Sequence, residues 1–348
     1  MNTKKHLLFL AALLSFSISL SSCSTTVTPP EGSVTIGDVA NDIRLIDGKL
    51  YILLNGSNAL KSYDPSTLIP SAARKLFIVN EGGFGKSNAS IDVWNFTDSA
   101  SSVGVKTFPS STIQFATGSA PARIIKTGSD EAMVTFYYTK EVDVIDTKAD
   151  TIKTRISVPG KTRGIAVLGG NAFITTDTVT NGVFIINTST KVVTQVANIS
   201  ESPYDVIADS AHNAVILFGQ GNFNTGVHPD IVWLDATTKT VLKKIDLGFD
   251  YYSSLFPAIK GGNDTMFICL GDRIVIVDLV SRTISNNSFI PKGYYGGIFD
   301  AKRNELILGD AKDFQNNGAV DIFDAATGIK KKSFPSGIIP GHFLIYQK

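Results

Sequence analysis

Short runs of Val, Ile, Leu, Phe and Tyr recur along residues 34–348, and each run is bounded by Gly, Asn, Asp or Ser. No helical period of apolar residues extends through this part of the chain. Apolar runs of this length between turn-forming residues are the signature of strands joined by tight turns. The pattern therefore predicts an all-β protein made of many short strands.

One unit recurs within this pattern: a strand that ends in Asp or Asn, a turn containing Thr or Ser, and a second strand. The turn residues are Asp64, Asn95, Asp146, Asn187, Asp235, Asp278 and Asp324. From Asp64 to Asp324 there are 260 residues in six intervals, a mean of about 43, and a four-stranded propeller blade takes about 40–50. Side chains of this type suit the turn because they bind backbone N–H groups that the reversal leaves unpaired. The repeat predicts one seven-bladed β-propeller of four-stranded antiparallel blades over residues 34–348.

The spacing of the repeat is uneven at its start. Asp64 and Asn95 are 31 residues apart, whereas Asn95 and Asp146 are 51 apart. We interpret this as an abbreviated first unit that lacks part of its outer strand. The chain also ends in an apolar segment, 341–346, that predicts one more inner strand. If this strand joins an N-terminal blade, the ring closes and no open edge remains; the sequence does not say which blade receives it.

A second motif precedes each turn and carries a family resemblance. The segments 51–55, 77–80 and 173–176 resemble the Tyr-Val-Thr-Asn strand of YVTN β-propeller repeats, in the YVTN/WD40-like superfamily. The segment Phe77–Gly85 resembles the opening blade of YncE-like lipoprotein propellers of Gram-negative bacteria. That group includes surface proteins that capture cobalamin for a TonB-dependent transporter. The resemblance implies cobalamin as a bound ligand and such a transporter as a partner.

The N-terminus has the features of a bacterial lipoprotein signal. Lys4 and Lys5 precede an apolar segment, 7–20, which is shorter than the ~20 residues of a membrane-spanning helix. Residues 20–23 (Leu-Ser-Ser-Cys) resemble a lipobox. We expect residues 1–22 to be a signal peptide, Cys23 to be lipidated and residues 23–33 to be a flexible tether. The alternative is an ordinary secretory signal. Because Ser24 is not the aspartate associated with inner-membrane retention, the outer membrane is the expected address, either surface-exposed or facing the periplasm.

The composition limits the classes of partner that we expect for this chain. Lys and Arg number 32 against 31 Asp and Glu, for a net charge of +1, so the chain lacks the basic character of a nucleic-acid-binding protein. Two cysteines cannot form a disulfide scaffold. Cys269 lies in an apolar run and is expected to be buried. We expect a monomer that meets the membrane through its lipid anchor only.

Aromatic residues gather in the loops expected at one face of the ring. In a four-stranded blade, the loop between strands two and three and the connection to the next blade open on the same face, around the central funnel. Tyrosine combines rigid apolar area with a polar tip, which suits binding of flat or amphipathic ligands. The predicted ligand-binding residues are Phe84, Tyr137, Tyr138, Tyr204, Phe223, His228, Tyr251, Tyr252, Tyr294 and Tyr295. The alternative is that these rings only pack over turns.

The sequence favours a non-catalytic envelope protein that binds a small molecule or a partner protein on this face, without a metal site or an enzymatic cofactor. No Gly-x-Ser-x-Gly elbow occurs, and the mature histidines are isolated from each other in the sequence. Two alternatives stay open: a protein–protein scaffold in the envelope, and an enzyme of lactonase or lyase type. The acidic residues that could serve such an enzyme are Glu81, Asp205, Asp250, Asp310 and Asp313.

Overall fold

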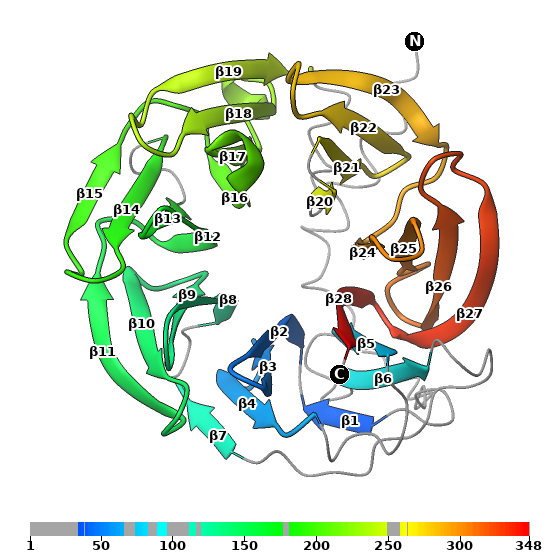
Figure 1. Ribbon diagram of the computed structural model, residues 1–348, viewed down its shortest axis with the longest axis horizontal. Coiled ribbons are helices and arrows are strands. Elements are labelled where there is room, and N and C mark those ends of the chain that lie inside the picture. The colour runs from blue at the N-terminus through cyan, green and yellow to red at the C-terminus, as the bar shows by residue number, and fades with distance from the viewer. Residues whose placement is uncertain are drawn as a thin grey trace.

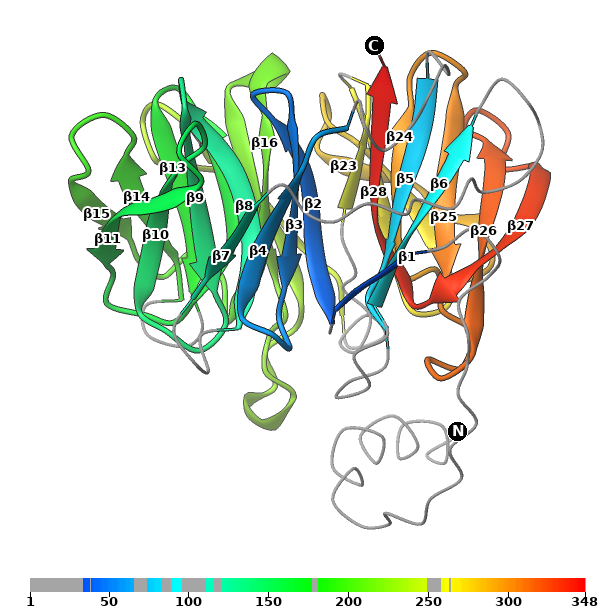
Figure 2. The ribbon, with the colours of Figure 1, turned by 90° about the horizontal axis from the view of Figure 1, so that it is seen from below.

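The computed structural model describes residues 34–37, 39–65, 74–82, 89–95, 111–115, 120–176, 181–248, 258–262 and 264–347. These residues form 28 strands and two single-turn 3-10 helices, η1 (Ser210–His212) and η2 (Phe223–Thr225). The strands pair into seven four-stranded antiparallel sheets, which stand around a central axis as the blades of a propeller (Figures 1 and 2). The predicted all-β propeller of four-stranded antiparallel blades is confirmed. Within the described ranges, no helix is long and apolar enough to cross a bilayer.

Five blades each come from one continuous stretch of chain, in which the first strand lies next to the channel and the fourth lies at the rim. Blade 2 contains β8 (Pro121–Gly128), β9 (Glu131–Phe136), β10 (Glu141–Asp146) and β11 (Thr151–Ser157). Blade 3 contains β12 (Thr162–Leu168), β13 (Asn171–Thr176), β14 (Val183–Asn187) and β15 (Val193–Val196). Blade 4 contains β16 (Pro203–Asp209), β17 (Ala214–Gly219), β18 (Asp230–Asp235) and β19 (Val241–Asp246). Blade 5 contains β20 (Ala258–Gly261), β21 (Thr265–Cys269), β22 (Ile274–Asp278) and β23 (Thr283–Ile290). Blade 6 contains β24 (Gly296–Asp300), β25 (Glu305–Asp310), β26 (Asn317–Asp324) and β27 (Lys330–Ile338).

The other two blades are interleaved in the sequence. Blade 1 contains β2 (Ala40–Ile46), β3 (Lys49–Leu54), β4 (Ala59–Tyr63) and β7 (Ser111–Gln114). Blade 7 contains β28 (Pro340–Gln347), β5 (Arg74–Asn80), β6 (Ala89–Asn95) and β1 (Val34–Gly37). The expectation of an abbreviated first unit is therefore wrong. Blade 1 has its outer strand, β7, but the strands β5 and β6 of blade 7 come before it in the chain, which explains the short interval between Asp64 and Asn95.

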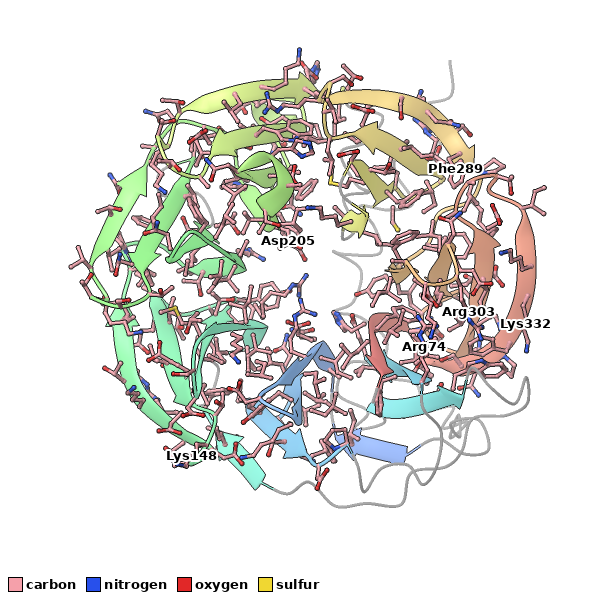
Figure 3. The ribbon with its side chains drawn as sticks, viewed as in Figure 1. Arg74, Lys148, Asp205, Phe289, Arg303 and Lys332 are labelled. Carbon is pink, nitrogen blue, oxygen red and sulfur yellow. The ribbon has the colours of Figure 1, made fainter. Side chains whose placement is uncertain are left out.

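The C-terminal strand closes the ring, as predicted, and the receiving blade is blade 7. β28 pairs with β5 from Pro340 opposite Asn80 to Gln347 opposite Arg74. Buried polar contacts fasten this composite blade to blade 6. The Arg74 guanidinium binds both carboxylate oxygens of Asp300, with Nη1 2.7 Å from Oδ2 (Figure 3). Ser336 Oγ donates to Asp92 at 2.6 Å.

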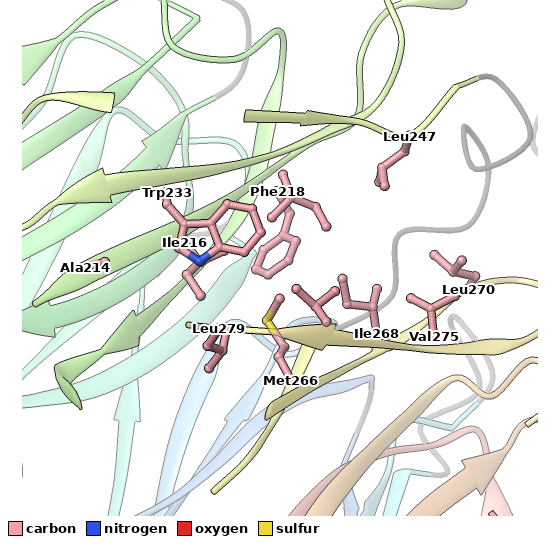
Figure 4. Close-up of a cluster of buried hydrophobic side chains, with 12 residues drawn as sticks. Ala214, Ile216, Phe218, Trp233, Leu247, Met266, Ile268, Leu270, Val275 and Leu279 are labelled. Atoms are coloured by element: carbon pink, nitrogen blue, oxygen red, sulfur yellow. The ribbon is translucent and has the colours of Figure 1, made fainter. Parts of the chain in front are cut away.

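Hydrophobic side chains fill the space between neighbouring blades. Both faces of a blade pack against another blade, so the second strands are buried along almost their whole length, as in β9 and β17. Between blades 4 and 5, Phe218 and Trp233 lie in one cluster with Met266 and Ile268 (Figure 4). Cys269 is fully buried, as predicted, and burial raises the pKa of its thiol to about 12.

The repeated Asp and Asn residues make the turns that the sequence predicts. Asp235 Oδ1 accepts the backbone N–H groups of Thr237 and Thr238 at 2.8 and 2.6 Å. Asp146, Asn187 and Asp324 make the same pair of bonds in blades 2, 3 and 6. These backbone bonds hold the pKa of the Asp146 and Asp235 carboxyls below the usual value. In these four blades, the repeat is thus a hydrogen-bonding motif at the end of the third strand.

Candidate functional site at the mouth of the channel

The inner strands of all seven blades start at the same end of the ring, and we call this end the mouth. The second strands finish there as well, so blade-to-blade connections and second-to-third strand loops meet around the axis. We define the mouth residues as Glu81, Arg123, Tyr137, Arg163, Tyr204, Asp205, Tyr295 and His342.

Four inner strands are preceded by a residue in the left-handed region of φ. These residues are Val39 (φ 32°), Ala120 (φ 47°), Ser202 (φ 48°) and Ile339 (φ 57°). Each of their carbonyls accepts the N–H group of the first residue after the second strand: Asn55 at 2.7 Å, Tyr137 at 2.9 Å, Gln220 at 3.1 Å and Glu81 at 2.9 Å. A left-handed φ is costly for β-branched residues such as Val39 and Ile339. Backbone strain of this type concentrates where a ligand or catalytic site requires a fixed geometry.

A β-bulge follows each of the four strained residues, and blade 3 has a bulge without one. In five blades the register of the inner strand shifts close to its start: at Ala40/Asp42, Pro121/Arg123, Thr162/Ile165, Pro203/Asp205 and Pro340/His342. A bulge places two residues opposite one and re-aims their side chains. The residues at these bulges include Arg123, Asp205 and His342, all of which line the channel.

Aromatic rings and an arginine form one wall of the mouth. The Arg163 guanidinium lies 5.2 Å from the centre of the Tyr137 ring and 5.6 Å from that of Tyr204, within the range of cation–π contacts. Burial, together with the neighbouring Tyr204 hydroxyl, raises the pKa of Tyr137. The Tyr137 phenol therefore stays neutral at ordinary pH and can donate or accept a hydrogen bond.

An ion pair spans the mouth between blades 2 and 4. Arg123 Nη2 lies 3.4 Å from Asp205 Oδ2, and the two side chains are 16% and 15% exposed. Blade 3, between them, carries Gly164, whose missing Cβ would lie 2.8 Å from the Asp205 Cα atom. Burial lowers the pKa of Arg123, but Asp205 and Asp42 more than offset this, so the guanidinium stays charged. Figure 3 shows Asp205 at the inner edge of the ring.

One carboxylate, Glu81, lies between a phenol and an imidazole on the opposite side, in blades 6 and 7. Tyr295 Oη donates to Glu81 Oε2 at 2.9 Å, and His342 Nε2 lies 3.0 Å from Glu81 Oε1, within ion-pair distance but outside hydrogen-bond geometry. Burial and the Glu81 charge raise the pKa of Tyr295 well above its ordinary value. Gly341 permits this packing, since a Cβ there would lie 2.5 Å from Glu81 Oε1.

Below the mouth, the inner strands enclose a cavity of about 260 Å³. Its lining combines charged side chains with apolar ones, and the lining residues come from the inner strands of all seven blades. Among the described residues, no group of three or more His, Cys, Asp or Glu side chains is placed to hold a metal ion.

The structure brings three of the ten predicted ligand-binding residues together at the mouth: Tyr137, Tyr204 and Tyr295. Tyr138 is adjacent to Tyr137, with ring centres 6.4 Å apart, and is 66% exposed. His228 lies in a second-to-third strand loop of blade 4, with Nδ1 2.8 Å from Asp246.

The remaining five residues are placed elsewhere or lie outside the described residues. Tyr294 is 3% exposed and donates to Asp321 at 2.7 Å. Its side chain is therefore not accessible to a ligand, and the prediction that Tyr294 binds one was wrong. It reaches the core because successive residues of the connection point to opposite sides, and Tyr295 is the one at the mouth. Phe84, Tyr251 and Tyr252 fall outside the described residues, as does the side chain of Phe223.

The acidic residues considered for an enzyme do not all lie at the mouth. Glu81 and Asp205 lie at the mouth. Asp310 pairs with Lys292 at 2.6 Å, and Asp313 caps a turn whose backbone bonds lower its pKa to about 2. Asp250 is outside the described residues.

Sequence reasoning missed the charged residues of the inner strands, namely Arg44, Arg123, Arg163, Lys260 and, as a mouth residue, His342. A signal was present: Asp42, Arg123, Asp205 and His342 each stand two residues after the first residue of an inner strand. An alignment of the repeats on their first strands, in place of the turn, would have shown this ring of polar positions.

Comparison with known proteins supports the fold. No family model matches the sequence, and no curated protein matches it. Among solved structures, the chain is similar to hydrazine synthase of Kuenenia stuttgartiensis, with a TM-score of 0.64 and 10% identity over 94% of this chain and 99% of that one. It is also similar to apo AztD of Citrobacter koseri, with a TM-score of 0.49 and 12% identity over 88% of this chain and 75% of that one. The class is a β-propeller. At 10% identity, the first likeness concerns the fold alone.

Proposed function

We propose that this chain is a non-catalytic, lipid-anchored binding protein of the bacterial outer membrane that captures an amphipathic small molecule at the mouth of its propeller. The observation that carries the proposal is the repeated strained residue and bulge at the start of the inner strands. They place Asp42, Arg123, Asp205 and His342 around one cavity, which lies beside the tyrosines of the mouth. Apolar surface combined with a few convergent polar groups is the usual form of a ligand site.

The N-terminal motif supports the proposed location at the outer membrane. Residues 20–23 resemble a lipobox, and the first described strand, β1, is the outermost strand of blade 7 (Figure 1). The propeller thus starts at the rim of the ring, away from the central channel.

Nutrient capture for a transporter is the more specific form of the proposal, and cobalamin is its first candidate ligand. Its support is the resemblance of Phe77–Gly85 to cobalamin-capturing lipoproteins. The test is co-elution of the full-length chain, in mild detergent, with cyanocobalamin on a sizing column, read by visible absorbance. We expect a coloured protein peak that Tyr204→Ala loses and Tyr138→Ala keeps. A colourless wild-type peak would remove cobalamin from the proposal.

The contacts of Glu81 favour one second candidate, an enzyme that uses acid–base catalysis. A carboxylate held between a phenol and an imidazole beside a cavity has the groups needed to move a proton. Under this candidate the chain hydrolyses a lactone, such as dihydrocoumarin, and Glu81→Gln abolishes turnover without loss of folding. Equal background hydrolysis by the wild type and Glu81→Gln would exclude lactonase activity on this substrate.

A further inference from the structure

The cavity below the mouth presents cationic side chains from three blades. Arg44 comes from β2 in blade 1, Arg123 from β8 in blade 2 and Lys260 from β20 in blade 5. All three line the same cavity, although blade 5 lies across the channel from blades 1 and 2 (Figure 1).

For Arg44 and Lys260, the carboxylate that balances the cation is much less accessible than the cation. The Arg44 side chain is 44% exposed and its partner Asp42 only 2%, with Nη1 and Oδ1 3.0 Å apart. Lys260 is 27% exposed and its partner Asp209 is fully buried, with Nζ and Oδ1 2.8 Å apart. At these two pairs, a group that enters the cavity therefore meets the N–H donors before the carboxylates.

The buried carboxylates also have other partners. Asp42 accepts the backbone N–H groups of Ile43 at 2.9 Å and of Ile124 at 3.0 Å. Asp209 lies 2.8 Å from His212 Nδ1. Asp205 lines the cavity too, but Arg123 opposes its charge at 3.4 Å. The acidic groups are thus engaged in holding blades together, while Arg44 and Lys260 keep donors directed at solvent.

We infer that the cavity is an anion subsite, which takes a phosphate or carboxylate group carried by the captured ligand. The assignment to the ligand rests on the proposed function, in which the ligand's body lies against Tyr137 and Tyr204. N–H donors on cationic groups bind ionised oxygens more strongly than neutral ones. The partly enclosed cavity strengthens the attraction because less water screens it.

The test is a calorimetric titration of the full-length chain in mild detergent with inorganic phosphate at low ionic strength. We expect saturable binding that added NaCl weakens. Arg44→Met should raise the Kd about tenfold or more, since a hydrogen bond to a charged group contributes enough for one to two decades. Lys260→Gln should act in the same direction. Lys243→Met, on the exposed outer strand β19, is the control and should bind as the wild type does.

Two results would overturn the inference: no saturable phosphate binding by the wild type, or an unchanged Kd in Arg44→Met. Lys260→Gln leaves Asp209 buried without its cation and can lose stability, whereas Asp42 keeps two backbone donors in Arg44→Met. Tyr204→Ala separates this inference from the proposed function. It should abolish capture of the ligand's body yet leave the phosphate Kd unchanged, so each idea can fail without the other.

Discussion

Replacement of Asp143 by Asn should make the protein less sensitive to pH, and the reason lies in blade 2. Asp143 is the middle of the third strand, 2% exposed, and Arg155 Nε lies 3.1 Å from its Oδ1. Burial raises the pKa of the carboxyl from 3.8 to about 6, because the Arg155 contact does not offset the desolvation and Glu141 adds to it.

The sign and size of the effect follow from this shift. Below pH 3.8 the carboxyl is protonated in both the folded and the unfolded protein, so it costs nothing. Above about pH 6 the carboxyl is charged in both states, and burial of the charge then destabilises the folded protein. A pKa shift from 3.8 to about 6 corresponds to a change of about 3 kcal/mol in the unfolding free energy, at about 1.36 kcal/mol per unit of pKa. The contribution of Asp143 to stability is therefore lost as the pH rises from about 4 to 6.

The assay is urea unfolding of the wild type and Asp143→Asn at several pH values between about 3.5 and 8. The difference in unfolding free energy between the two chains should move by about 3 kcal/mol in favour of the variant across that interval. Other groups titrate in both chains and cancel in the difference.

Asp321 provides a control of opposite sign. It stands at the equivalent position of blade 6, three residues before the turn residue, but it accepts hydrogen bonds from Ser333 at 2.6 Å, Tyr294 at 2.7 Å and Lys330 at 2.9 Å. Burial raises its pKa, but these donors outweigh burial and leave the pKa below the ordinary value. Asp321→Asn should therefore lose stability relative to the wild type as the pH rises. A pH-independent difference for Asp143→Asn, or the same trend for both variants, would refute the reasoning.

Three further predictions concern packing and the mouth. Arg74→Met leaves the fully buried Asp300 without its cation and should lower the unfolding free energy by about 3–5 kcal/mol in denaturant titration; a loss under about 1 kcal/mol would contradict the role of this pair in ring closure. Trp233→Ala empties a fully buried site between blades 4 and 5 and should cost about 3–5 kcal/mol by the same assay, against little change for Val241→Ala on the exposed outer strand. Gly164→Ala places a Cβ against Asp205 and should separate it from Arg123, so ligand binding should weaken although the protein still folds; unchanged binding would show that the Arg123–Asp205 pair does not position the ligand.

The fold could be predicted from the sequence because the repeat is a local chemical motif. Asp235 and its equivalents bind backbone groups two and three residues further on, so their spacing is visible in one dimension. The composition of blades 1 and 7 could not be predicted in this way. The strands β5 and β6 carry the same turn signal as a complete unit, and only long-range pairing with β28 and β1 assigns them to blade 7.

The site was predicted in part for a related reason. Loop position selects tyrosines near the mouth but does not say which of two neighbours points inward, hence the error at Tyr294. The charged residues escaped notice because each looks like an ordinary surface residue in its own strand. Arg123 and Asp205 are 82 residues apart, and they meet because blades 2 to 4 stand around one channel and Gly164 leaves room between the two side chains.

The most direct test of ligand capture at the mouth is mass spectrometry of small molecules that copurify with the full-length chain from its native cells. We expect a compound that is bound by the wild type and by Tyr138→Ala, and is absent from Tyr204→Ala, with all three chains equally folded by circular dichroism. A compound retained equally by all three chains, or none bound by the wild type, would contradict the account.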